Sequence, residues 1–212
     1  MRNLSSLMLM TFAFASLLGS CSIWDQLGQA PSNEMFSGFS NSPHFNREEQ
    51  VFENRIPDVL DNMNERIDWR LMLEYFTSDS SRRTPDKPLP EVNPPDLQAF
   101  LEPTESLRFI WLGHSTLLVN AQNKLILFDP VCSNSAAPVN FLLQRFQPAV
   151  LSLEELPPID YIVISHDHYD HLDMRSVQFF RDKEATFLIP LGIKSHLEYW
   201  GVASKNIVEL DW

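Results

Sequence analysis

Residues 160–173 constrain this chain more than any other stretch, because a buried-strand pattern runs directly into a cluster of metal-ligand side chains. The run from Tyr161 to Ile164 is apolar and β-branched, which is typical of a strand covered on both faces. The side chains that can bind a cation follow at once, and they are His166, His168, Asp170 and His171. Loops at the carboxyl ends of strands carry the chemistry of α/β folds, so we expect the site there.

The spacing of these side chains indicates how they divide between two ions. On an extended loop, positions i and i+2 share a side, so His166 and His168 can bind one cation. If the chain turns there, Asp170 and His171 swing toward a second cation. Neutral imidazole and carboxylate suit zinc, with bonds of roughly 2.0–2.2 Å. Two such ions about 3.5–4 Å apart can share and activate one water. The alternative is a solvated polar loop. The number of ligand-type side chains directly after one strand argues against it.

A resemblance to a known family rests on three short motifs. Residues 165–173, Ser-His-Asp-His-Tyr-Asp-His-Leu-Asp, resemble the His-x-His-x-Asp-His signature of the metallo-β-lactamase superfamily. Residues 111–116 read Trp-Leu-Gly-His-Ser-Thr, and residues 128–130 read Phe-Asp-Pro. Together the motifs are similar to the branch containing N-acylphosphatidylethanolamine-hydrolysing phospholipase D and its bacterial relatives. Ascorbate-6-phosphate lactonase-like proteins are a more distant resemblance.

The resemblance implies an α/β fold, the αβ/βα sandwich of two similar halves, with a site for two zinc ions. It implies that His166 and His168 hold the first ion and that Asp170 and His171 hold the second. In the family, further ligands lie on later strands. Here His196 and Asp211 are the remote candidates downstream, and we expect His196 on a helix surface. The expectation is therefore a sandwich truncated to its first half, with an N-terminal helical extension and an apolar sheet face left exposed.

The resemblance also gives roles to groups around the ions. Asp170 is expected to orient the attacking water, and His114 to line the pocket or contact substrate rather than bind metal, so both count as catalytic. Asp129 matches the family's first acidic motif. Its carboxylate is expected to accept the free N–H of a ligand histidine or to brace the loop. The alternative for Asp129 is a turn-former before Pro130.

The first twenty residues form a separate segment. Arg2 precedes an apolar run, 7–18, of signal-peptide length and too short for a stable membrane helix. Leu-Gly-Ser-Cys at 18–21 then resembles a bacterial lipoprotein cleavage site, which implies that Cys21 becomes a lipidated terminus. Several acyl chains would anchor the protein in the membrane of the bacterial cell envelope. A plain signal peptide, giving a periplasmic or secreted protein, and a short buried helix are the alternatives.

Composition narrows the partners and the source of stability. The 212 residues carry a formal net charge of −12 with only 16 Lys and Arg, which argues against nucleic acid as a partner. The sequence has 2 cysteines. With Cys21 lipidated, Cys132 has no partner, so folding depends on packing rather than on disulfides. We expect Cys132 to be a semi-buried bystander thiol rather than a group at the metal site.

Local patterns divide the chain into three parts. These parts are a signal peptide at 1–20, a tether, helical extension and Pro-rich connector at 21–100, and the half-domain at 101–212. Within the second part, residues 22–46 lack periodicity and are expected to be irregular. Residues 47–76 have apolar side chains near helical spacing and predict a helix.

The third part predicts alternating elements after a meander. Strands are expected at 107–112, 115–121, 125–128, 160–165, 186–189 and 207–210, and helices at 172–182 and 192–200. The first three strands form a β-meander, and the remainder gives parallel strands with helices on one face. The loop at 131–158 is long enough to be functional, with a short helix at 140–146.

These features support one main hypothesis and two alternatives. The main hypothesis is a zinc-dependent hydrolase that cleaves a phosphodiester in a lipid or related small ester. Lactone hydrolysis is the alternative within enzymes, because the first-half residues do not select the bond. The non-enzymatic alternative is an inactive lipoprotein fragment or weak metal binder. Such a half-domain has three origins to weigh: an interrupted reading frame, a fragment that needs a partner, or a dimer formed through the exposed sheet.

Overall fold

The computed structural model describes residues 21–56, 95–136 and 144–211, with a few single residues between 70 and 87. The expected signal peptide, most of the expected helix at 47–76 and residues 137–143 lie outside the described residues. The chain divides into two compact units, residues 1–31 with 92–212 and residues 32–91. In the part of the chain that the structure describes, no helix is long and apolar enough to cross a membrane.

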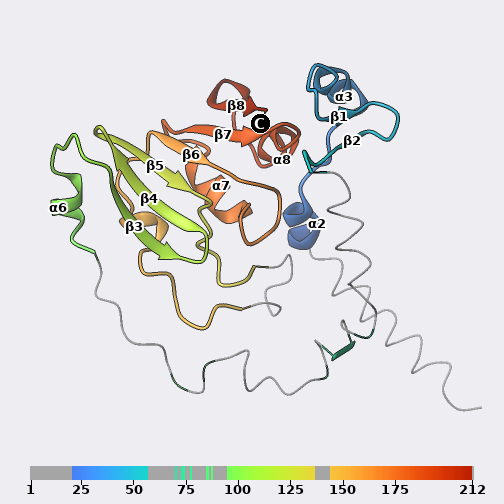
Figure 1. Cartoon of the computed structure of the whole chain (residues 1–212). Coiled ribbons are helices and arrows are strands. Elements are labelled where there is room, and N and C mark those ends of the chain that lie inside the picture. The colour runs from blue at the N-terminus through green and yellow to red at the C-terminus, as the bar shows by residue number, and fades with distance from the viewer. Residues whose placement is uncertain are drawn as a thin grey trace, which may run out of the picture. The chain divides into compact units, whose positions relative to one another are not determined.

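A six-stranded mixed sheet forms the larger unit, and its spatial order follows the chain (Figure 1). Its strands are β3 (Arg108–Gly113), β4 (Thr116–Ala121), β5 (Lys124–Phe128), β6 (Tyr161–Val163), β7 (Thr186–Pro190) and β8 (Ile207–Leu210). Strands β3, β4 and β5 pair antiparallel. Strands β5 to β8 pair parallel. The sequence-based expectation of a meander followed by parallel strands is confirmed.

The turn between β4 and β5 shows why the meander closes tightly. Gln122 and Asn123 both have positive φ, 51° and 64°. Such a two-residue loop matches the right-handed twist of the strands that it joins, and asparagine tolerates the conformation. The Asn123 side chain also accepts a hydrogen bond from the Thr104 backbone N–H at 3.0 Å. The turn therefore fixes the register of β4 on β5.

Short helices connect the strands of this unit. They are α6 (Leu97–Leu101) before β3, α7 (Met174–Phe180) between β6 and β7, and α8 (Lys194–Tyr199) between β7 and β8, with 3-10 turns at Leu153–Glu155 and Ser204–Asn206. Helix α7 begins after Asp173, whose side chain accepts a hydrogen bond from the Arg175 backbone N–H. The expected helices at 172–182 and 192–200 are thus present with shorter bounds.

One face of the sheet carries the hydrophobic core. Leu118, Leu127 and Ile162 lie on three adjacent strands of this face and are fully buried. Val177 of α7 and Leu197 of α8 join the same cluster. The β-α-β connections therefore bury the apolar sides of both helices against this face.

The opposite face of the sheet is much less buried. Phe109 and Trp111 on the edge strand β3 are 67% and 65% exposed, and Leu210 at the other edge is 51% exposed. Register places Trp111 beside Leu117 and Leu117 beside Phe128, all on this face. This face has the exposed apolar side chains that are expected for a half-sandwich.

The smaller unit corrects the expectation of an irregular arm followed by a helix from residue 47. Residues Asn33–Phe39 form helix α3, and β1 (Phe45–Asn46) pairs antiparallel with β2 (Val51–Phe52). Asn46 turns the chain, because its side-chain oxygen accepts hydrogen bonds from the backbone N–H groups of residues 48 and 49. The aromatic rings of Phe39, Phe45 and Phe52 then pack at centroid distances of 5.0–5.7 Å. Over residues 47–56, contact between these aromatic rings overrides the helical spacing.

Replacing Leu118 with alanine is expected to destabilise the larger unit by about 2–5 kcal/mol, because this fully buried side chain leaves a cavity at the centre of the sheet. Leu107→Ala is the matched control: Leu107 is 69% exposed, so its removal should change stability by about 0.5 kcal/mol or less. Urea unfolding measures both. Equal losses for the two variants would contradict this assignment of the core.

Candidate metal centre

The directions of the strands bring the candidate site together at the carboxyl ends of β5 and β6. Strands β5 and β6 run parallel, so Asp129 after β5 and Ser165 after β6 come out at the same edge. Strands β3 and β4 run antiparallel to each other and β4 runs antiparallel to β5, so the turn at 114–115 lies there too. The turn at 114–115, the turn at Asp129 and the ligand loop after Ser165 therefore lie close together.

Asp129 joins two of these segments through its carboxylate. Its Oδ1 accepts the Ser165 backbone N–H at 2.7 Å, and its Oδ2 accepts the Ser165 hydroxyl at 2.8 Å. Oδ2 also lies 2.9 Å from Nδ1 of His171. Asp129 is 7% exposed, so these donors supply the hydrogen bonds that a buried carboxylate needs. The carboxylate therefore occupies the place expected for a group that braces the loop and orients a histidine.

A group of potential ligand atoms surrounds Asp170. His114 Nε2 lies 2.8 Å from Asp170 Oδ2, and His171 Nε2 lies 3.7 Å from the same oxygen. Ligand atoms of His114, Asp170 and His171 all fall within 4.8 Å of one another. Burial alone would raise the pKa of Asp170, but the hydrogen bond from His114 and the nearby His171 bring that pKa below its ordinary value. Asp170 is therefore ionised, and its carboxylate oxygen can serve as a metal ligand.

The other two predicted ligands lie against this group. The ring centroid of His166 is 4.0 Å from that of His171 and 4.6 Å from that of His168. Nδ1 of His166 lies 2.9 Å from the Ser165 hydroxyl. Burial, together with the neighbouring histidines, lowers the pKa of His166. A neutral imidazole is the form that binds a metal, so this histidine is in the state that a ligand requires.

The structure thus brings every predicted ligand to one place and adds His114 to the expected pair of Asp170 and His171. His114, expected to contact substrate, lies in the tightest cluster with Asp170 and His171. His166 and His168 pack beside that cluster. Whether these side chains bind one ion or two remains a prediction.

Two residues of the site have backbone conformations that side chains disfavour. His114 has φ 47° and follows Gly113, which has φ 103°. Asp129 has φ 39°. Non-glycine residues with positive φ carry a conformational penalty and cluster at functional sites. Both turns that present candidate groups therefore sit in strained conformations that the surrounding hydrogen bonds hold.

The donor set fits a divalent cation such as zinc. A histidine that binds a metal through one nitrogen usually donates its other N–H to a carboxylate or carbonyl. His171 has that arrangement, because Nδ1 bonds Asp129 and Nε2 is directed at the Asp170 cluster. Imidazole and carboxylate are the ligands expected for zinc at such a place.

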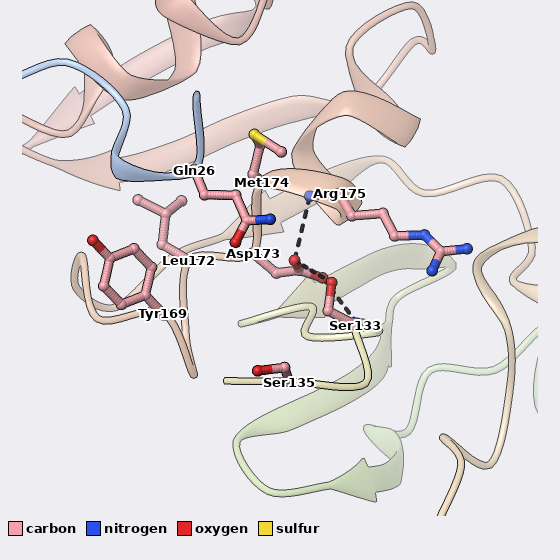
Figure 2. Close-up of a pocket in the computed structure, with 8 residues that line it drawn as sticks. All are labelled: Gln26, Ser133, Ser135, Tyr169, Leu172, Asp173, Met174 and Arg175. Atoms are coloured by element: carbon pink, nitrogen blue, oxygen red, sulfur yellow. Dashed lines mark hydrogen bonds between the residues drawn. The ribbon is translucent and has the colours of Figure 1, made fainter. Parts of the chain in front are cut away.

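A second buried aspartate fixes the loop after β5. Asp173 accepts hydrogen bonds from the backbone N–H groups of Cys132 and Ser133 and from the hydroxyls of Ser133 and Ser176. Figure 2 shows its contacts with Ser133 and Arg175 beside a small cavity of about 40 Å³, which holds a water or two at most. Asp173 therefore ties the start of α7 to the chain that leaves Asp129.

A larger cleft of about 500 Å³ adjoins the candidate ligands. Asp167, His168 and Asp170 line it from the loop, and His196 of α8 and Trp200 directly after α8 line it from the other side. His196, expected on a helix surface rather than as a ligand, lies on α8 and is half-buried: its Nδ1 is buried, and burial lowers its pKa. Periodicity could not predict this burial, because a shift of one residue, about 100° around the helix axis, decides which side chains of so short a helix face the cleft.

Other groups of the site were also missed in the sequence. Ser165 bonds Asp129 through both its N–H and its hydroxyl. Thr116 donates its hydroxyl to the Asp129 carbonyl at 2.8 Å and accepts the Val131 N–H at 3.2 Å. Ser165 and Thr116 stand beside the histidine motifs, and that adjacency was the available signal.

The similarity of this chain to known proteins includes the segment that carries the ligand loop. The family model described as "Beta-lactamase superfamily domain" matches residues 124–212. Over 150 residues the chain is 38% identical to the uncharacterized protein Rv0906 of Mycobacterium tuberculosis, covering 70% of this chain and 40% of that protein.

Two further relatives carry names that describe a reaction. N-acyl-phosphatidylethanolamine-hydrolyzing phospholipase D 1 of Caenorhabditis elegans is 36% identical over 108 residues, covering 48% of this chain and 30% of the worm protein. A UPF0173 metal-dependent hydrolase of Caldivirga maquilingensis is 38% identical over 76 residues, covering 36% of this chain and 28% of that protein. The chain thus spans 40% or less of each of the three relatives.

The Cys132 thiol is expected to resist alkylation in the folded protein. Burial raises its pKa to about 11, so at pH 8 only about one molecule in a thousand carries the reactive thiolate. Mass spectrometry of the Cys132 peptide after iodoacetamide treatment should show slow labelling at pH 8, faster labelling as the pH approaches 11, and rapid labelling in urea. Equal rates in folded and unfolded chains at pH 8 would contradict the bystander assignment.

Proposed function

On the premise that residues 124–212 belong to the metallo-β-lactamase superfamily, we propose that the chain carries ligands of a zinc-dependent hydrolase that cleaves a phosphodiester. The observation that supports this most directly is the environment of His171. Its Nδ1 bonds a buried carboxylate, Asp129, while its Nε2 faces a second carboxylate, Asp170. A histidine with no metal role has little need of two carboxylates on its two nitrogens.

His166 and His168 would hold one ion, and Asp170 and His171 would hold a second, with His114 beside them. When bound, zinc lowers the pKa of a water and stabilises the negative charge that develops in hydrolysis. Asp129 keeps the proton of His171 on Nδ1, which leaves the Nε2 lone pair free. Hydrogen bonding from His114 keeps the Asp170 carboxylate ionised, so its oxygen can accept a proton or orient a water.

The substrate class follows from the relatives rather than from this chain. One relative is named as a phospholipase D, so a lipid or another small phosphodiester is the proposed substrate. The half-exposed imidazole of His114, 51% accessible, is placed to contact such a substrate from the β3–β4 turn. Lactone hydrolysis uses the same kind of site and serves as the second bond to assay.

A second candidate function is a metal-binding protein that acts with a partner. The observation that favours it is the exposed apolar sheet face, where Phe109 and Trp111 are about two-thirds accessible. Self-association through that face belongs to the same proposal. We also propose that Cys21, the first residue of helix α2, is the lipidated residue that holds the chain on a bacterial envelope membrane.

Zinc stoichiometry tests the proposed function. The purified chain should hold about two zinc ions by elemental analysis, and His171→Ala should lose zinc, because it removes a ligand and the partner of Asp129. His44→Ala is the matched control from the other compact unit and should retain the parent zinc content. The zinc-loaded parent should also hydrolyse bis(4-nitrophenyl) phosphate. A zinc content that His171→Ala leaves unchanged, or a loaded chain that cleaves neither a phosphodiester nor a lactone, would sink the proposal.

A further inference from the structure

An N-terminal helix forms one wall of the larger cleft. Helix α2 (Cys21–Leu27) belongs to the same compact unit as the sheet. Asp25 attaches it to α8: its carbonyl accepts the Trp200 indole N–H at 2.7 Å, and its carboxylate accepts the Tyr199 hydroxyl at 3.1 Å. Gln26 and Leu27 thereby face the cleft that the ligand loop lines. The residue pattern at 22–46 predicts an irregular tether, so the docked helix corrects that expectation.

Gly28 brings the end of α2 directly against His196. Its φ is +67°, which favours glycine, and a Cβ built on it would lie 2.1 Å from Nδ1 of His196. Among the described residues, that buried Nδ1 has no hydrogen-bond partner. An unpaired buried nitrogen is costly, so the ring is held there by packing rather than by its own polar bonds. The other nitrogen, Nε2, is the one left for the cleft.

Polar and apolar side chains both line the cleft. His168 and Asp170 line it from the ligand loop, and the apolar side chains are Leu27 of α2 and the largely buried Trp200, which directly follows α8. A volume of about 500 Å³ lies in the range of small-molecule sites. His196 lines the same cleft, and the nearby Asp167 carboxylate partly offsets the lowering of the His196 pKa by burial.

We propose that His196 is a substrate-contacting residue whose Nε2 hydrogen-bonds the ester group of a phosphate ester, while the apolar group of that ester packs on Leu27 and Trp200. This inference rests on the proposed function and identifies the residues of the cleft that would contact its substrate. Helix α2 is then part of the binding site, and Gly28 acts as a positioning residue because it permits the close packing that aims His196.

Binding of hexyl phosphate to the purified full chain tests the inference by calorimetry, with inorganic phosphate as the headgroup alone. The parent should bind hexyl phosphate more tightly than inorganic phosphate. His196→Leu should weaken hexyl phosphate binding about tenfold, the value of one hydrogen bond. His196→Gln, which keeps a nitrogen near the Nε2 position, should recover most of that loss.

Glycine variants test the positioning role independently. Gly28→Ala should weaken hexyl phosphate binding, because its new methyl group displaces His196. Gly38→Ala is the matched control, since a Cβ there meets nothing within 4 Å, and it should bind like the parent. Thermal unfolding of each variant verifies that it is folded.

Zinc content measured on every sample separates this inference from the proposed function. A parent that holds no zinc counts against the metal site, and the same comparison is then made on the metal-free chain. Equal affinity of folded parent, His196→Leu and Gly28→Ala for hexyl phosphate overturns the role of His196. Equal affinity of the parent for hexyl and inorganic phosphate overturns the role of Leu27 and Trp200.

Discussion

The carboxylate of Asp129 is the interaction on which the rest of the site depends. It lies almost fully buried and accepts hydrogen bonds from the backbone and hydroxyl of Ser165 and from His171. A buried charge without partners would destabilise the fold strongly, so these donors and the carboxylate hold each other in place. Because the donors belong to the ligand loop, the position of that loop is coupled to the stability of the sheet.

The order of the strands supplies the remaining groups around that carboxylate. The meander brings the β3–β4 turn to the edge where β5 and β6 end, which places His114 against Asp170. Thr116 secures the chain reversal after β5 by bonding the carbonyl of Asp129 and the N–H of Val131. The β3–β4 turn, the turn after β5 and the ligand loop after β6 therefore meet because the register of the strands places them side by side.

Much of this arrangement was predictable where residue pattern and geometry agree. Apolar runs located all six strands of the sheet, since strands with a covered face have few other places to go. The histidine and aspartate spacing located the ligand loop, and Asp129 was expected beside a ligand histidine, where the structure has it near His171. Contacts of short polar residues such as Ser165 depend on register, which single-residue patterns do not encode.

The failures have physical causes as well. The helix predicted at 47–76 is wrong over residues 47–56, because Phe45 and Phe52 gain more from packing across a hairpin than from a helix, whereas residues 70, 73 and 74 are helical. The docking of α2 on α8 depends on Asp25, whose carbonyl and carboxylate find donors far along the chain. His196 lines the cleft because Gly28, at the end of that docked helix, packs against its Nδ1. Long-range pairing of this kind leaves no local periodicity.

The zinc dissociation constant of Asp129→Asn measures how far the Asp129 carboxylate holds the candidate metal ligands in position. Asparagine keeps the size of the side chain but removes its charge, and its amide cannot serve all three donors of Ser165 and His171. Competition with a chromophoric chelator should show zinc binding weakened about 10–100-fold relative to the parent. Asp182→Asn, at a side chain 80% exposed, should leave it unchanged. A folded Asp129→Asn chain that binds zinc as tightly as the parent would contradict the account.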